Sequence, residues 1–246
     1  MRRYIYFVLL LTSCVRQKYV VMDMVHHNPG EAMTESKFLD PSFLKKNEYG
    51  AKVFFLFEAA QFGIDWKSFD PSLFPDTTEA GRWVAEKAEI IHKKYDAAKK
   101  EDLQVYCMLD MLVLPSLLVE KHRTELTNEQ GKLDISKPYT QLCIRELMKE
   151  MFETFPQLDG LVIRTGETYL HDAPYYVGNH PVQNGMYDHI TLINLLREEV
   201  CERRNKKLFY RTWEILFVRY RQYRTTSKSL FLYQAYHDGF LEINNY

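Results

Sequence analysis

The segment from Asp159 to Asn179, DGLVIRTGETYLHDAPYYVGN, joins a short apolar run to a dense group of polar and aromatic residues. Its apolar part, Leu161–Ile163, consists of branched aliphatic residues and belongs to a predicted strand at Leu158–Ile163, which has the length of a buried strand. Arg164 and Glu167 follow it closely and can carry charge or exchange protons. In parallel α/β proteins, functional residues follow the carboxyl ends of strands. The segment therefore predicts a strand that ends at a functional site.

Apolar runs alternate with stretches of helical periodicity along the chain. Further strands are predicted at Tyr19–Met24, Ala51–Phe57, Leu103–Leu114 and Lys207–Trp213. Helical periodicity predicts helices at Thr77–Lys100, Tyr139–Phe155 and Ile190–Asn205. Strands that alternate with helices at this interval indicate βαβ units, and hence an α/β domain with a parallel sheet.

The polar ends of the strands favour a barrel over a doubly wound open sheet. No GxGxxG or GxxxxGK[ST] motif follows a strand, so the usual phosphate-binding signatures of open nucleotide-binding sheets are absent from the sequence. A (β/α)8 TIM-type barrel would bring all the polar strand ends to one face. We therefore predict a barrel, which is incomplete because only about five βα units precede Glu214. Each further unit needs roughly 30 residues, and too few residues remain.

The end of the sequence differs from what precedes it. Residues 215–246, ILFVRYRQYRTTSKSLFLYQAYHDGFLEINNY, are rich in aromatic residues but follow neither helical nor strand periodicity. Our hypothesis is that a partial barrel domain spans 15–214 and that an out-of-frame tail replaces the remaining units of a longer protein.

The beginning of the sequence, MRRYIYFVLLLTSC, is typical of a targeting segment. Two arginines precede an apolar stretch that is too short to span a bilayer. The ending Leu-Thr-Ser-Cys resembles the bacterial lipobox, in which the cysteine carries lipid after cleavage. Residues 1–14 are thus predicted to be a lipoprotein signal peptide, with Cys14 the lipidated residue that anchors the protein in the cell envelope, facing the periplasm or on the outer-membrane surface. The alternative is a buried N-terminal strand with a chance cysteine.

Composition and cysteine spacing limit the classes of function. The chain is 46% hydrophobic and 26% charged with a net charge of −1, a profile that indicates a globular domain and no nucleic-acid partner. Cys107, Cys143 and Cys201 show no CxxC or His-Cys spacing, so buried free thiols are expected rather than a zinc site or disulfides. We predict neither a metal site nor a cofactor.

Four carboxylates near predicted strand ends are candidate catalytic residues. Glycoside hydrolysis needs two carboxyl groups across the scissile bond, one acting as acid and one as base or nucleophile. The candidates are Glu58, Asp110, Glu167 and Glu214. Glu167 is the preferred catalytic residue, and the sequence leaves open which carboxylate is its partner.

Basic and aromatic residues near the same strand ends are candidates for substrate binding. Arg164 could lower the pKa of a nearby carboxylate or bind a substrate carboxylate. The alternative to both functional roles is a local ion pair with Glu167 that only stabilises the loop. Aromatic rings can stack on sugars or simply pack under long loops, and histidines can position hydroxyls or ligate a metal. The adjacent pair His26 and His27 would point in opposite directions on a strand, which argues against a shared metal. The remaining binding candidates are Tyr169, His171, Trp66 and Trp213, with Tyr175 and Tyr176 as further aromatic platforms.

Four stretches carry a resemblance to a known group of proteins: MVHHNPGE, KVFFLFEAAQFGIDW, VYCMLDMLVLP and DGLVIRTGETYLHDAPYYVGN. Together they resemble the N-terminal part of a glycoside-hydrolase-like TIM-barrel protein of the kind found among carbohydrate-processing bacterial lipoproteins. The resemblance implies a (β/α)8 barrel, an oligo- or polysaccharide as partner and acidic catalytic residues, with Glu167 the best-matched position. Such proteins continue well beyond Trp213, so this chain departs from the pattern at its tail.

Three readings of the function remain open at this stage. The first is a lipid-anchored glycoside hydrolase, or what remains of one. The second is a non-catalytic surface lipoprotein that binds glycans. The third is a truncated chain that does not fold stably, because an unfinished barrel exposes strand edges and apolar faces.

Overall fold

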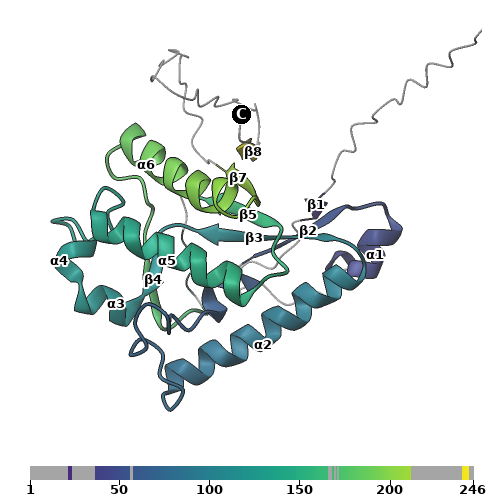
Figure 1. Cartoon of the computed structure of the whole chain (residues 1–246), viewed down its shortest axis with the longest axis horizontal. Coiled ribbons are helices and arrows are strands. Elements are labelled where there is room, and N and C mark those ends of the chain that lie inside the picture. The colour runs from purple at the N-terminus through teal and green to yellow at the C-terminus, as the bar shows by residue number, and fades with distance from the viewer. Residues whose placement is uncertain are drawn as a thin grey trace, which may run out of the picture.

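Six strands form the main sheet of the computed structural model, which describes residues 22–23, 37–55, 58–165, 168, 170, 172–211 and 240–243. Their spatial order is β1 (Met22–Asp23), β2 (Ala51–Phe54), β3 (Gln104–Asp110), β5 (Gly160–Arg164), β7 (Lys207–Arg211) and β8 (Phe240–Ile243). The first five are parallel neighbours in chain order, and β8 pairs with β7 antiparallel. The prediction of an α/β fold with a mostly parallel sheet is confirmed (Figure 1).

Helices connect the parallel strands. The three longest are α2 (Glu79–Lys100), α5 (Pro138–Thr154) and α6 (Met186–Leu196), which ends in the π-helical segment η4 (Arg197–Glu202). The shorter ones are η1 (Lys37–Leu39), α1 (Pro41–Lys46), η3 (Ala60–Gly63), α3 (Ser116–Lys121) and α4 (Arg123–Leu126). The predicted helices at 77–100 and 139–155 are confirmed within two residues at each end, and α6 begins four residues before its predicted start.

The third predicted strand, Leu103–Leu114, is wrong at its C-terminal end. The main ladder stops at Asp110, and the chain then enters a second, two-stranded antiparallel sheet of β4 (Val113–Pro115) and β6 (Tyr176–Gly178). Because Val113 and Leu114 remain buried in the new sheet, the apolar run continues across the break. Hydrophobicity alone therefore did not reveal where the strand ends.

The two faces of the main sheet are both apolar, but the helices that the structure describes cover only one of them. Alternate strand residues, such as Leu109 and Ile163, belong to a large core that includes the buried residues of α2, α5 and α6. The other alternate residues form a second cluster, to which no described helix contributes. Its members are Ala51, Val53, Phe55, Tyr106, Met108, Val162 and Phe209. Strands that are apolar on both faces are characteristic of a parallel sheet with both faces buried.

Helix α2 was predicted accurately because residues at its two ends carry local helix signals. Thr78 precedes it with extended backbone, and its hydroxyl accepts a hydrogen bond from the Gly81 N–H at 3.0 Å. Glu79 lies in the first turn, and Lys99 and Lys100 lie in the last, which suits the helix dipole. Gly81 is required for close approach, because a Cβ there would lie 2.1 Å from the Pro75 carbonyl oxygen. These signals are all local in sequence.

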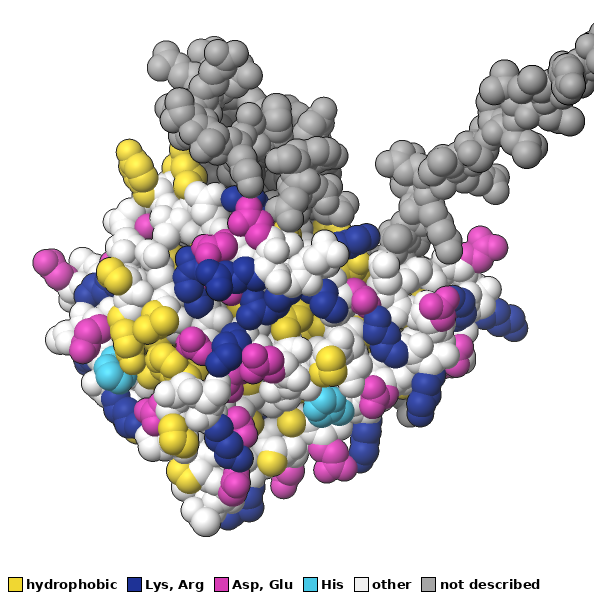
Figure 2. Space-filling view, in the orientation of Figure 1, with side chains coloured by type: hydrophobic (Ala, Val, Ile, Leu, Met, Phe, Trp, Pro, Cys, Tyr) yellow, Lys and Arg dark blue, Asp and Glu magenta, His cyan; other side chains and the backbone are white. Residues whose placement is uncertain are grey.

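Charged side chains hold α5 and η4 together. Arg145 of α5 donates to Glu199 at 2.5 Å and to Glu198 at 2.8 Å, and Arg204 donates to Glu199 at 2.9 Å. Arg203 Nε also lies 3.2 Å from Glu199 Oε1. The Glu199 side chain is almost fully buried, so the three arginines compensate a charge that has lost most of its water. Figure 2 shows that Lys and Arg side chains are interspersed with Asp and Glu over the face in view.

Asp70, in the loop before α2, is expected to make the stability of the protein depend on pH. Hydrogen bonds from Lys121 at 2.8 Å and from Ser72 lower the pKa of Asp70 to about 2, with Lys121 the largest cause. Because this pKa lies below the unfolded value, the stabilisation is complete above about pH 4 and is lost as the pH falls towards 2.

The difference in melting temperature between the wild type and Asp70→Asn should therefore be constant from pH 5 to 7 and shrink below pH 4. Glu153→Gln is a suitable control, since Glu153 is exposed and makes no ion pair with a described residue. A difference that stays constant down to pH 2.5 would mean that Lys121 does not stabilise the Asp70 carboxylate.

Candidate functional site

The candidate site lies at the carboxyl ends of β3 and β5. Asp110 is the last residue of β3 and lies opposite Arg164, the last residue of β5, in the parallel ladder. Side chains alternate between the faces of a strand, so Asp110 lies on the same face as Met108, and Arg164 lies on the same face as Val162. Both polar residues therefore cap the second apolar cluster, on the face that the described helices do not cover.

Asp110 and Arg164 form a buried, two-point ion pair. Arg164 Nε donates to Asp110 Oδ1 at 2.5 Å, and Nη2 donates to Oδ2 at 2.7 Å. Their side chains are only 5% and 3% exposed. The guanidinium carbon lies 4.6 Å from the centre of the Phe55 ring, in cation–π geometry. Two parallel hydrogen bonds between planar groups fix both orientations, so the ends of β3 and β5 are held in register.

This ion pair bears on the roles predicted for Arg164. Arg164 forms an ion pair with Asp110 on the neighbouring strand, 54 residues away in sequence. The predicted ion pair with Glu167 involves a residue outside the described part of the chain and stays a prediction. The Nε and Nη2 donors of Arg164 are directed to Asp110, and the role of Arg164 in binding a substrate carboxylate stays a prediction.

Glu58 lies beyond the end of β2 and is bound to a helix. Its carboxylate accepts a short hydrogen bond from Lys94 of α2, and its backbone carbonyl accepts from the Tyr95 hydroxyl at 2.8 Å. Helix α2 packs against the face of the sheet opposite to Asp110. Glu58 and Asp110 thus follow neighbouring strands but are bound to partners on opposite faces.

Trp66 is placed in the core rather than at a surface. The side chain is fully buried and lies edge-on to Phe69, with ring centroids 6.1 Å apart. Tyr176 is also buried, and its ring stacks on Phe74 at 5.6 Å. Both positions favour the packing alternative over sugar stacking. Tyr175, by contrast, is partly exposed.

The other predicted site residues lie outside the described residues, and their roles stay predictions. They are Cys14, His26, His27, Glu167, Tyr169, His171, Trp213 and Glu214.

A second polar pair near the site was not anticipated from the sequence. The Tyr210 hydroxyl on β7 lies 2.8 Å from His189 Nδ1 on α6, and burial raises the pKa of Tyr210. Tyr210 is opposite Ile163 in the ladder, so this pair lies on the helix-covered face of the sheet. A tyrosine that follows the apolar residues Leu208 and Phe209 in β7 was the available signal. The signal does not identify the partner, which comes from a helix packed on the sheet.

Cys107, Cys143 and Cys201 are buried free thiols, as predicted, and burial raises the pKa of Cys107 to about 12. Among the described residues, no group of three or more His, Cys, Asp or Glu side chains is arranged to hold a metal ion. No described helix is both long and apolar enough to cross a membrane.

Comparisons with known proteins give partial structural similarities. No family model matches the chain. No curated protein matches it either. One similar solved structure is a GH138 enzyme targeting pectin rhamnogalacturonan II, at 17% identity and a TM-score of 0.36 over 53% of this chain and 14% of that one.

Two further similar structures are carbohydrate-active by name. A noncanonic maltogenic α-amylase from Thermotoga neapolitana has 15% identity and a TM-score of 0.34, over 53% of this chain and 34% of that one. The galactosidase domain of an α-galactosidase–sucrose kinase has 13% identity and a TM-score of 0.39, over 70% of this chain and 23% of that one. The chain thus spans between 14% and 34% of the length of these three structures.

Proposed function

We propose that the chain is a carbohydrate-processing protein of the glycoside-hydrolase type, built on part of a (β/α)8 barrel. The observation that carries the proposal is the buried Asp110–Arg164 pair at the carboxyl ends of two neighbouring parallel strands. In a barrel this end of the strands forms the active-site face.

The strand order supports the barrel over a doubly wound sheet. A doubly wound sheet reverses its strand order at the ligand-binding crevice. Here β1, β2, β3, β5 and β7 follow one another in chain order without a reversal. A barrel also has an inner face that is filled by strand side chains alone, and the second apolar cluster has that composition.

The roles of the carboxylates follow from their surroundings. Glu167 comes three residues after Arg164, so the ion pair fixes the strand end from which Glu167 departs. We assign Glu167 the role of acid or nucleophile. Asp110 already accepts two hydrogen bonds from Arg164, which suits a positioning role better than proton donation.

The test is release of reducing ends from a panel of plant and host polysaccharides by the purified chain. We expect release by the wild type and by Glu129→Gln, which changes an exposed loop glutamate, and none by Glu167→Gln. Release that is the same for Glu167→Gln and the wild type would remove Glu167 from the mechanism.

A second candidate function is glycan binding without cleavage. The observation that favours it is that both described candidate carboxylates, Glu58 and Asp110, are ion-paired with Lys94 and Arg164. In that case polysaccharide is retained by the protein, no reducing ends are released, and Glu167→Gln changes neither result.

We also propose that Cys14 carries a lipid that holds the protein in the cell envelope. When the full chain is expressed in a bacterium that processes lipoproteins, we expect the wild type to partition with membranes and to incorporate labelled fatty acid. Cys14→Ser should lose both the label and the membrane fraction, whereas Cys143→Ser should retain both. Equal labelling of wild type and Cys14→Ser would contradict the lipid anchor.

A further inference from the structure

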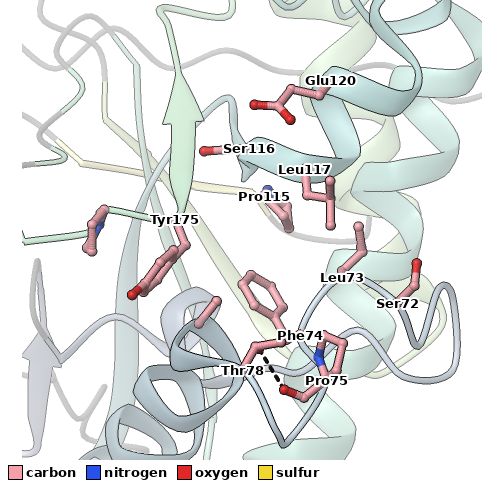
Figure 3. Close-up of a pocket in the computed structure, with 12 residues that line it drawn as sticks. Ser72, Leu73, Phe74, Pro75, Thr78, Pro115, Ser116, Leu117, Glu120 and Tyr175 are labelled. Carbon is pink, nitrogen blue, oxygen red and sulfur yellow. Dashed lines mark hydrogen bonds between the residues drawn. The ribbon is translucent and has the colours of Figure 1, made fainter.

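A groove of about 310 Å³ lies apart from the Asp110–Arg164 pair, and no role has been assigned to it (Figure 3). Three segments line it: residues 72–80 around the start of α2, residues 115–120 at the start of α3, and residues 174–175 before β6. The first and third segments follow β2 and β5, and the second begins at the end of β4, which comes after β3 in the chain. The groove is thus built from the same set of strand-to-helix connections that contains the candidate site.

The walls of the groove are apolar and well supported. Phe74, Pro115 and Leu117 line it together with the ring of Tyr175. Phe74 is stacked against Tyr176, and the Tyr175 ring packs edge-on against Trp83 at 5.8 Å. The Ser116 N–H donates to the Tyr175 carbonyl at 2.8 Å, which ties two of the lining segments together. A groove with walls held in this way needs little rearrangement to bind a ligand.

Two polar side chains at one end of the groove are available for a ligand. Glu120 and Ser116, both from α3, lie near each other in Figure 3. Neither side chain makes a hydrogen bond or ion pair with any residue that the structure describes. The hydroxyls of Ser72 and Thr78, in contrast, are engaged by Asp70 and by the Pro75 carbonyl. An ionised carboxylate is an acceptor only, so Glu120 selects a ligand that donates hydrogen bonds.

We propose that this groove is a sugar-binding subsite that takes a pyranose unit of a neutral polysaccharide. A pyranose ring combines an apolar C–H face, which matches Tyr175 and the proline and leucine side chains, with hydroxyl donors that match Glu120 and Ser116. The volume is at the lower end of the range for small-molecule sites, as a short saccharide requires. A uronic acid unit is disfavoured, because its carboxylate would lie beside that of Glu120. The inference rests on the proposed function in that the polysaccharide is the one processed at the candidate site.

The experiment is affinity electrophoresis of the full chain in gels that contain soluble starch, arabinoxylan or polygalacturonate. For at least one neutral polymer we expect retardation of the wild type, about tenfold weaker binding of Tyr175→Ala and binding of Tyr175→Phe within about twofold of the wild type. Glu120→Gln should weaken binding to that polymer by about fivefold and reduce the discrimination against polygalacturonate. Tyr187→Ala and Glu129→Gln, which change an exposed tyrosine and an exposed glutamate outside the groove, should bind as the wild type does.

The outcomes separate this inference from the proposed function. If polymer is bound through Tyr175 and Glu120 but no reducing ends are released, the subsite stands and the hydrolase proposal fails. If reducing ends are released while all groove variants bind as the wild type does, the subsite is wrong and the hydrolase proposal stands. Failure of the wild type to bind any neutral polymer, or preference for polygalacturonate, overturns the subsite. Glu120 is exposed, so Glu120→Gln keeps the test valid even if Tyr175→Ala does not fold.

Discussion

Replacing Arg164 by methionine is expected to lower the free energy of unfolding by about 3–5 kcal/mol. The change leaves the Asp110 carboxylate, 5% exposed, without the guanidinium that donates two hydrogen bonds to it. A buried charge that has lost its partner retains its full cost of dehydration, whereas methionine still fills most of the space beside Phe55. Urea or guanidinium unfolding, followed by circular dichroism, measures the loss.

Two comparisons show whether loss of the ion pair between Asp110 and Arg164 is the cause. The double variant Asp110→Leu/Arg164→Met removes both charges and is expected to recover most of the loss. The exposed pair Glu89 and Lys93 on α2 serves as the control, and Glu89→Gln should cost less than about 0.5 kcal/mol. If the double variant were as unstable as Arg164→Met, the loss would come from packing rather than from a stranded carboxylate.

Phe155→Ala is expected to lower the free energy of unfolding by a similar amount, about 3–5 kcal/mol. Phe155 directly follows α5 and is fully buried, with its ring centroid 5.7 Å from Tyr95 and 4.6 Å from His92, both on α2. It also fills the space beside Gly63, where an added Cβ would lie 2.7 Å from the Phe155 ring. Removal of the ring leaves a cavity where α2, η3 and the end of α5 meet.

Substitutions of graded size test this cavity explanation. Phe155→Leu keeps most of the apolar volume and is expected to cost about 1–2 kcal/mol. Leu142→Ala, on an exposed part of α5, should cost less than about 1 kcal/mol, because 42% of its side chain is already in water. Equal losses for Phe155→Leu and Phe155→Ala would show that ring contacts, rather than cavity volume, determine the effect.

Local signals predicted the three longest helices and the parallel strands of the main sheet, but not the short elements α1, α3, α4 and β6. Thr78, the acidic first turn and the basic last turn define α2 within the helix itself, and the apolar runs at 51–54 and 160–163 are strands because both of their faces are buried. The end of β3 was not predictable in this way. Val113 and Leu114 are as apolar as the strand before them, and only their pairing with β6, more than 60 residues later, places them in another sheet.

The same distinction between local signals and long-range pairing applies to the residues of the candidate site. The sequence by itself determined that Arg164 follows an apolar run at the end of a strand and that Asp110 interrupts another apolar run, but not that β3 ends at Asp110. Only the tertiary structure decided that they bind each other, because the register of β3 against β5 places the two residues opposite one another on one face. Likewise, the burial of Trp66 and the pairing of Glu58 with Lys94 depend on how α2 and the loop before it pack on the sheet. The identity of a residue and its place along a strand are local properties, whereas its partner is set by strand register and helix packing across tens of residues of sequence.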